Sequence, residues 1–143
     1  MKPLLNALTV IFSLLAGLLH WDLWANHGYD GTPVRELIIG AAVVGTLVGL
    51  LAFSERPGAT LPAVVANAVF LFAFALSRVA QLPTLHGGWS ESGLAPTGVT
   101  SLGVSTTLVL LVAEALAVAG GLGTFLLSRE PRPVPLPTAF ART

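Results

Sequence analysis

The sequence predicts an all-α fold, an integral membrane four-helix transmembrane bundle with both termini in the cytoplasm. Hydrophobic residues make up 54% of the 143 residues and charged residues only 10%, whereas a soluble domain carries about 25% charged residues. The apolar residues gather in four long runs separated by polar turns, and one helical span of a bilayer needs about 20 mainly apolar residues. We therefore expect a multi-pass protein of the plasma membrane, with the lipid bilayer as its surroundings.

The first span is expected at residues 4–24, directly after Met1 and Lys2. A cleaved signal peptide is the alternative, because its N-terminus is also short and basic. The apolar run is longer than the usual signal-peptide core of about 7–15 residues. The stretch Asp22–Ala25 also lacks the small-x-small pattern of a cleavage site. The segment is therefore predicted to remain in the protein as a transmembrane helix.

Three further apolar runs predict spans at residues 36–53, 61–80 and 102–127. Together with the first span they form a predicted transmembrane domain at residues 1–128. Residues 129–143 form a predicted proline-rich cytoplasmic tail, with prolines at positions 131, 133, 135 and 137. Proline has no backbone N–H to donate and fixes φ, so this tail is expected to be extended.

The basic residues predict the orientation of the bundle. Loops on the cytoplasmic side of a membrane protein carry an excess of Lys and Arg. With both termini inside, five basic residues lie inside and two, Arg35 and Arg78, lie outside; the inner five are Lys2, Arg56, Arg129, Arg132 and Arg142. This arrangement also brings Trp21, Trp24 and Trp89 to the outer interface, where tryptophan is enriched.

Two sets of small residues predict helix-packing faces. Ala41, Gly45 and Gly49 recur every four residues in the second span, so one face allows another helix backbone to approach closely. Packing within the bundle and a homo-oligomer seam are the two interpretations. A second face, in the fourth span, contains Gly103, Thr107, Glu114, Ala117 and Gly121.

Glu114 is the most informative single residue, because a carboxylate near the centre of a bilayer costs about 2.5–3.5 kcal/mol even on the lenient insertion scale. Its candidate partners are Arg78 and His20. A structural Glu114–Arg78 pair is the first interpretation, a proton or cation site the second, and a protonated, hydrogen-bonded carboxyl group the third. Asn67, in the third span, is expected to make an ordinary interhelical hydrogen bond.

Three histidines, His20, His27 and His86, are predicted to lie on the outer side near several carboxylates. Imidazole and carboxylate can ligate zinc, copper or iron. The sequence lacks any recognised metal-ligand spacing, so the histidines are expected to be interfacial, and no metal or other cofactor is predicted. With no cysteine and a formal net charge of zero, thiolate chemistry is excluded and nucleic acid is not an expected partner.

No catalytic motif is present, so the chain is not expected to be an enzyme. The leading hypothesis is an accessory or assembly subunit of a larger membrane complex, with other membrane subunits as partners. The alternative is a minimal proton- or cation-coupled transporter centred on Glu114. A third hypothesis is a metal- or redox-binding subunit that uses the outer histidines.

The motif Leu19–Trp24, the Gly28-Tyr29 pair that follows it, Glu91–Leu94 and Val112–Ala115 carry a resemblance. The chain resembles uncharacterised small four-span membrane proteins of high-GC Gram-positive (actinobacterial) type. This resemblance extends over all four spans and implies a four-helix membrane protein without an established chemistry. The chain departs from the group's pattern at Asp30, where arginine is usual, and over Val34–Leu37.

Overall fold

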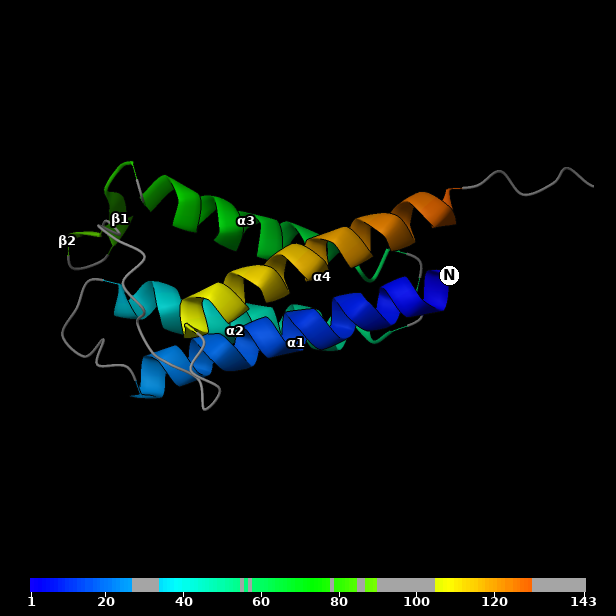
Figure 1. Ribbon diagram of the computed structural model, residues 1–143, viewed down its shortest axis with the longest axis horizontal. Helices are drawn as coiled ribbons and strands as arrows, with labels where there is room; N and C mark the ends of the chain where they lie inside the picture. Colours follow the sequence, from blue (N-terminus) through cyan, green and yellow to red (C-terminus); the bar gives the residue numbers. More distant parts are fainter. Residues whose placement is uncertain are drawn as a thin grey trace, which may run out of the picture.

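The computed structural model describes residues 1–26, 34–54, 56, 58–77, 79–84, 87–89 and 105–129. Its elements, in chain order, are helices α1 (Lys2–Asn26), α2 (Arg35–Ala52) and α3 (Leu61–Ser77), strands β1 (Leu82–Thr84) and β2 (Gly87–Trp89), and helix α4 (Thr106–Ser128). The helices run alternately up and down (Figure 1). The start of α1, the turn between α2 and α3, and the end of α4 therefore lie at one end of the bundle. The prediction of a helical fold with four helices is confirmed.

Helix α1 is the centre of the packing. It contacts α2 and α4 extensively, while α3 packs mainly against α4 and more loosely against α2. Helices α1 and α3 therefore lie across a diagonal of the bundle. The loose contact between α2 and α3 leaves space for a cavity that residues of both helices line.

Three helices, α1, α2 and α4, are long and apolar enough to cross a membrane, whereas α3 is apolar but has 17 residues. Helix α3 ends at Ser77, earlier than the predicted residue 80. Helix α4 begins at Thr106 rather than at residue 102, because Ser105 has an extended backbone (φ −56°, ψ 125°) and its side chain accepts a hydrogen bond from the backbone of Leu108. Ser105 is therefore the N-cap residue, which marks the point where α4 begins.

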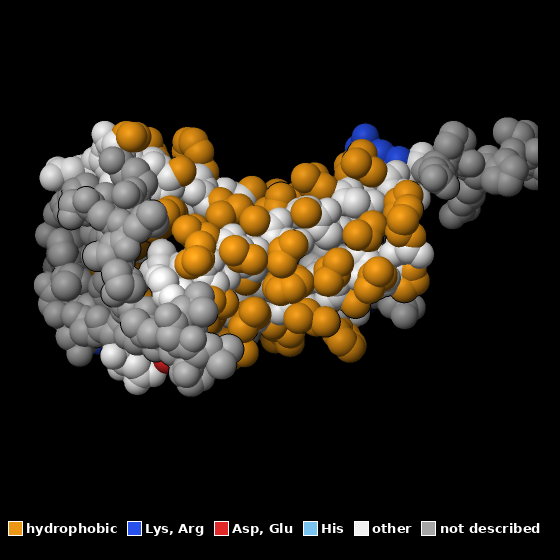
Figure 2. Space-filling model, in the orientation of Figure 1, with side chains coloured by type: hydrophobic (Ala, Val, Ile, Leu, Met, Phe, Trp, Pro, Cys, Tyr) orange, Lys and Arg blue, Asp and Glu red, His pale blue; other side chains and the backbone are white. Residues whose placement is uncertain are grey.

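Polar side chains share the interior with small and medium-sized apolar ones, and large apolar side chains cover the outside. The largest fully buried side chains are all polar: Glu114, Asn67, Thr9, Thr106, Ser13 and Ser77. Large apolar residues such as Leu18, Leu50 and Phe72 are 57–67% exposed, and apolar side chains are spread over the visible helical surface in Figure 2. A water-soluble protein has the reverse distribution. An apolar exterior over long apolar helices is what a lipid environment requires.

Glycines set the close approach of α1 to its neighbours. A Cβ atom at Gly17 would lie 2.7 Å from the backbone nitrogen of Thr46 in α2, and one at Gly45 would lie 3.2 Å from the Cα atom of Gly17. A Cβ atom at Gly120 in α4 would lie 2.9 Å from the backbone oxygen of Leu5. The α1–α2 and α1–α4 contacts therefore depend on backbone surfaces that have no side chain. Gly103 lies outside the described residues.

Two parts of the connections between the helices belong to the described residues. Gly58, in the turn between α2 and α3, has φ of +81°, a conformation that disfavours residues with a Cβ atom. Strands β1 and β2, which the sequence did not predict, pair antiparallel at the opposite end, with Leu82 opposite Trp89.

Candidate functional site

Glu114 lies on the face of α4 that points into the bundle, and only 1% of the residue is exposed. Ala117 and Gly121, which share this face, are also buried. Helical spacing of three and four residues places all of them on one stripe. The stripe faces α1 and α3, so the carboxyl group is held inside the protein and away from the lipid.

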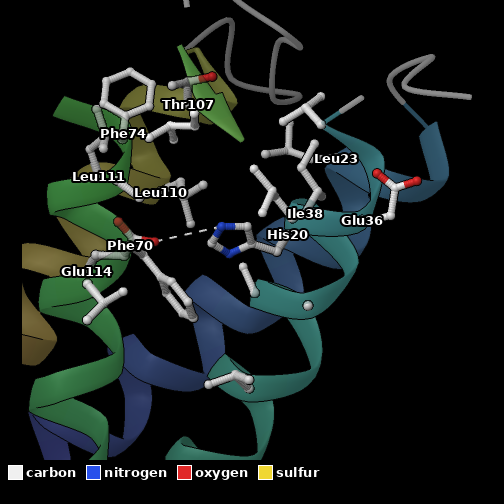
Figure 3. A pocket seen from close by; sticks show the side chains of 18 residues that line it. His20, Leu23, Glu36, Ile38, Phe70, Phe74, Thr107, Leu110, Leu111 and Glu114 are labelled. Carbon is white, nitrogen blue, oxygen red and sulfur yellow. Dashed lines mark ion pairs between the residues drawn. The ribbon is translucent and has the colours of Figure 1, made fainter. Parts of the chain in front are cut away.

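His20 of α1 is the residue that the structure brings to Glu114. Its Nε2 atom lies 3.8 Å from Oε1 of Glu114 (Figure 3). This separation is too long for a hydrogen bond, and Oε1 has no hydrogen-bond partner among the described residues. The imidazole ring also meets the Phe70 ring of α3 edge to face, with 5.5 Å between ring centroids.

The backbone determines which nitrogen of His20 carries a hydrogen. Nδ1 lies 2.9 Å from the backbone oxygen of Ala16, and a carbonyl oxygen can only accept, so Nδ1 donates this hydrogen bond. In the neutral ring, Nε2 then presents its lone pair on the side of Glu114. The site thus places two acceptors, Nε2 and a carboxyl oxygen, next to each other.

The structure does not describe the other residues that were predicted for this site. Arg78, the first predicted partner of Glu114, lies outside the described residues, as do His27 and His86. Within the described part of the chain, no group of three or more His, Cys, Asp or Glu residues could hold a metal ion. His20 and Glu114 alone would supply two ligands, fewer than the three protein ligands of a typical zinc site.

A cavity of about 510 Å³ adjoins the pair, and His20 and Glu114 both line it. Its walls come from all four helices and are mainly apolar. Ligand-binding cavities in proteins span about 300–1,000 Å³ and combine apolar walls with a few polar groups. By volume and lining, the cavity is therefore suited to a small molecule.

The cavity opens on the surface between α2 and α3. Leu37 and Val44 of α2 and Val69 of α3 line it and are 40%, 41% and 55% exposed. Gly40 lines the α2 wall, and a Cβ atom there would meet nothing within 4 Å. Because the surrounding surface is apolar, this opening faces the region that lipid would occupy.

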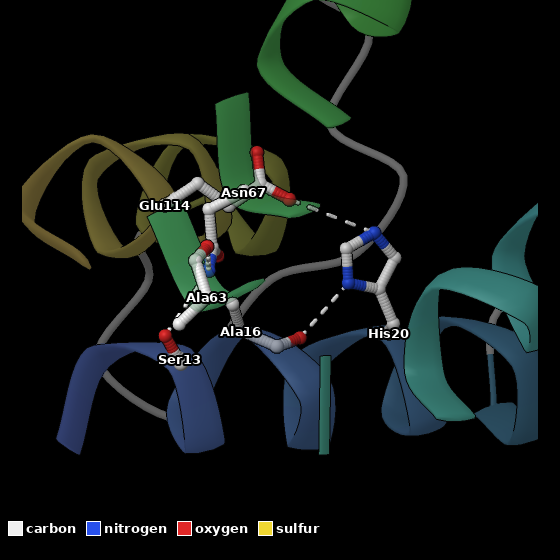
Figure 4. A network of polar contacts seen from close by, with 6 residues as sticks. All are labelled: Ser13, Ala16, His20, Ala63, Asn67 and Glu114. Carbon is white, nitrogen blue, oxygen red and sulfur yellow. Dashed lines mark hydrogen bonds and ion pairs between the residues drawn. The ribbon is translucent and has the colours of Figure 1, made fainter. Parts of the chain in front are cut away.

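A second polar cluster lies near Glu114 in the interior (Figure 4). The amide nitrogen of Asn67 in α3 donates to Oγ of Ser13 in α1 at 3.0 Å and to the backbone oxygen of Ala63 at 2.7 Å. The bond to Ser13 joins the two diagonal helices. Sequence reasoning noted Asn67 but missed Ser13, because serine is common in membrane helices and no spacing connects residues 54 positions apart.

The chemical capacity of the site follows from its atoms. Glu114 and His20 supply acceptors, the aromatic rings of Phe70 and Phe74 line the same cavity, and the described part of its lining contains no Lys or Arg. Comparisons with protein-family models, curated proteins and solved structures find no match. The resemblance to actinobacterial four-span proteins therefore stays a prediction.

Proposed function

We propose that this chain is a four-span protein of the plasma membrane, with both termini in the cytoplasm, that binds a lipophilic amine from the bilayer. The amine would occupy the cavity between α2 and α3, with its protonated nitrogen at Glu114 and His20. The observation that carries this proposal is the buried carboxyl oxygen of Glu114, which faces an apolar cavity without a hydrogen-bond partner in the described structure.

The arrangement of the helices supports four spans. Helix α3 leads from the end of the bundle where α2 ends toward the end where α4 begins (Figure 1), so it crosses the bundle in the direction opposite to α2 and α4. Its 17 residues give a helix of about 26 Å, a few ångströms shorter than a typical hydrocarbon core, and local thinning of the bilayer accommodates such a difference.

The charges support the orientation. Of the described basic residues, Lys2, Arg56 and Arg129 lie at the end that contains the first residue of α1, and Arg35 lies at the opposite end. The positive-inside rule places the end with three basic residues in the cytoplasm. Trp21 and Trp24, near the end of α1, then lie toward the outer interface.

Single-cysteine labelling tests this topology, and the native chain has no cysteine to interfere. We expect Asn26→Cys to react with a membrane-impermeant maleimide on intact cells, and Ser128→Cys to react only after permeabilisation. Three spans would bring Ser128 to the side opposite Lys2, so labelling of Ser128→Cys together with protection of Lys2→Cys would refute the four-span proposal. The reverse pattern at Asn26 and Ser128 would refute the orientation.

The geometry of the acceptor pair favours an ammonium group. Nε2 of His20 and Oε1 of Glu114 are 3.8 Å apart, so one nitrogen can lie about 2.9 Å from both, at hydrogen-bonding distance. A protonated primary or secondary amine has at least two N–H groups and can donate to both acceptors. Its charge would also compensate the buried carboxylate, which is otherwise costly.

The walls of the cavity favour a lipophilic cation over other amphiphiles. Phe70 and Phe74 line the cavity, and aromatic faces attract cations. Among the described residues, the lining includes the carboxyl groups of Glu36 and Glu114 and no basic side chain, an arrangement that disfavours an anionic ligand. A cation and a proton would compete for Glu114, and this competition is the requirement that a proton-coupled transporter has to meet.

The geometry at Glu114 and His20 supports the binding of a cation, which is one part of the transporter hypothesis. Transport itself stays a prediction. That the chain serves as an accessory subunit, and that it is not an enzyme, stay predictions. Co-purification with larger membrane proteins in mild detergent tests the first of these and does not depend on the cavity.

Binding of adamantan-1-amine to the chain in uncharged nanodiscs tests the proposal, with adamantan-1-ol as a neutral ligand of similar shape. We expect the amine to bind at least about tenfold more tightly than the alcohol, because a charged hydrogen bond contributes about 1.5–3 kcal/mol. Glu114→Gln should remove this preference. Asp22→Asn is the matched control, because Asp22 bonds Asn26 and does not line the cavity.

The pH dependence and a blocking variant complete the test. Amine affinity should fall as the pH falls, by at most about tenfold per pH unit, because one proton competes with one ammonium group. Gly40→Leu should block the cavity while leaving Glu114 in place, because the added side chain enters open space. Equal binding of the amine and the alcohol, or unchanged amine binding by Gly40→Leu, would contradict the proposal. If Glu114→Gln instead lowers stability and leaves amine binding intact, the His20–Glu114 pair is structural.

A further inference from the structure

A second depression lies at the other end of the bundle, and we name it the terminal cleft. It has a volume of about 640 Å³ and lies between the first turns of α1, the turn that joins α2 to α3, and the last turn of α4. Its lining residues include Lys2, Asn6, Phe53, Ser54, Arg56 and Phe125. None of them lines the cavity at Glu114, so the two sites are separate.

The terminal cleft is cationic. Lys2 and Arg56 come from separate segments of the chain and both line it, and no Asp or Glu is among the described residues of its lining. Oγ of Ser54 accepts a hydrogen bond from the backbone nitrogen of Arg56 at 3.4 Å, so its own hydrogen can still be donated. Cationic side chains and hydroxyl groups are the donors that commonly bind a phosphate group.

The cleft also has an apolar side. Phe53 and Ile11 line it and are 75% and 57% exposed, on the outer surface of the bundle. A free phosphate would make no favourable contact with these apolar side chains, whereas the acyl chains of a phospholipid would pack against them. The combination of cationic and apolar lining residues matches a ligand with a charged head and a hydrocarbon tail.

We infer that the terminal cleft binds an anionic phospholipid of the cytoplasmic leaflet, with its phosphate at Lys2 and Arg56 and its acyl chains along Ile11 and Phe53. This inference depends on the orientation given in the proposed function but not on amine binding at Glu114. The cytoplasmic leaflet is the one that carries anionic lipids facing juxtamembrane basic residues. An annular lipid attracted only by overall charge would not distinguish Lys2 and Arg56 from other cations at this end.

Arg129 provides the matched control. It lies at the same end of the bundle, directly after α4, and is exposed. Its guanidinium carbon lies 4.2 Å from the centroid of the Phe125 ring, and Arg129 does not line the cleft. The largest patch of Lys and Arg visible in Figure 2 lies at this end of the molecule. Arg129→Gln changes the net charge of this end and replaces none of the residues that line the cleft.

Native mass spectrometry of the detergent-solubilised full chain, titrated with phosphatidylglycerol or with phosphatidylcholine of identical acyl chains, tests the inference. We expect phosphatidylglycerol to bind more tightly. The variant with both Lys2→Gln and Arg56→Gln should bind it roughly 25-fold more weakly, because each basic residue contributes about fivefold. Arg129→Gln should change the affinity by less than about twofold, and Arg56→Lys should retain most of it.

Three results would overturn the inference. An equal loss with Arg129→Gln would show attraction by diffuse surface charge. Equal binding of phosphatidylcholine would show contact by acyl chains alone. Tight binding of glycerol 1-phosphate, at the affinity of the lipid, would show a site for a free phosphate. If the double variant fails to fold, the comparison of Arg56→Gln with Arg56→Lys replaces it, and equal affinity of these two would also overturn the inference.

Discussion

The contact between α1 and α2 at Gly17 allows a stability prediction with an internal control. A Cβ atom at Gly17 would lie 2.7 Å from both the backbone nitrogen and Oγ1 of Thr46. Neither atom can move away easily, because one belongs to the α2 backbone and the other is held by two hydrogen bonds. Oγ1 of Thr46 donates to the backbone oxygen of Ala42 at 2.8 Å and accepts from Nε1 of Trp21 at 3.3 Å. Gly17→Ala therefore forces the two helices apart.

The magnitude follows from these distances. Ordinary van der Waals contact begins near 3.4 Å, so the backbones would have to separate by about 0.7 Å. Overpacking of this kind costs about 1–3 kcal/mol, and loss of the Trp21 hydrogen bond adds about 1 kcal/mol. The better helix propensity of alanine returns about 1 kcal/mol. We expect Gly17→Ala to lower the free energy of unfolding by about 1–3 kcal/mol.

Gly40→Ala is the control, because it makes the same chemical change in a helix where the new Cβ atom meets nothing within 4 Å. It should leave stability unchanged or raise it by up to about 1 kcal/mol. Both variants are compared by SDS-induced unfolding of the protein in dodecyl maltoside, followed by circular dichroism. Equal stability of the two variants would refute the close approach of α1 to α2 at Gly17.

The other predictions use the same unfolding assay. Ser13→Ala should cost only about 0.6 kcal/mol, because Asn67 keeps its bond to a backbone oxygen, whereas Asn67→Ala should cost more since it also leaves a cavity. A loss with Ser13→Ala as large as that with Asn67→Ala would contradict this ranking. Gly121→Ala should destabilise the protein by about 1–3 kcal/mol, because its Cβ atom would overlap Cγ2 of Val64, and adding Val64→Ala should restore most of the loss. No rescue would mean that another contact is responsible. Gly58→Ala should cost about 1–2 kcal/mol, because φ of Gly58 is +81°, and an unchanged stability would argue against this turn.

The helices could be predicted from the sequence because lipid imposes a simple rule on composition and length. Runs of apolar residues gave the existence and order of all four helices. The ends were less accurate where they depend on local chemistry. Helix α4 begins later than its apolar run because Ser105 caps it, and hydropathy does not detect a serine cap. Helix α3 ends at Ser77, although the predicted span extends to Ala80.

The site could be predicted only in part. Glu114 stands out in any sequence of this composition, because a carboxyl group within a span is rare. The sequence could not decide whether the side chain of Arg78 or that of His20 lies beside Glu114, because this depends on the relative rotation of α1, α3 and α4. The cavity left no sequence signal at all. It results from the loose packing of α2 against α3, and the residues that line it there are the same apolar types that face lipid elsewhere.

Asn67 and Glu114 show why one buried polar group is structural and the other is a candidate for binding. Both are fully buried, and each has an oxygen without a partner in the described structure. The amide nitrogen of Asn67 donates twice within the bundle, and an unpaired amide oxygen is neutral. A carboxylate costs far more to bury than a neutral group. Among the described residues, Oε1 of Glu114 has no hydrogen-bond donor and faces a space large enough for a molecule. A purely structural role would be served better by a donor in that space, such as the one that Asn67 provides for Ser13. The arrangement at Glu114 therefore favours a group that arrives from outside the chain. The affinity of the Glu114→Gln variant for adamantan-1-amine, compared with that of the Asp22→Asn variant, tests whether that group is a cation.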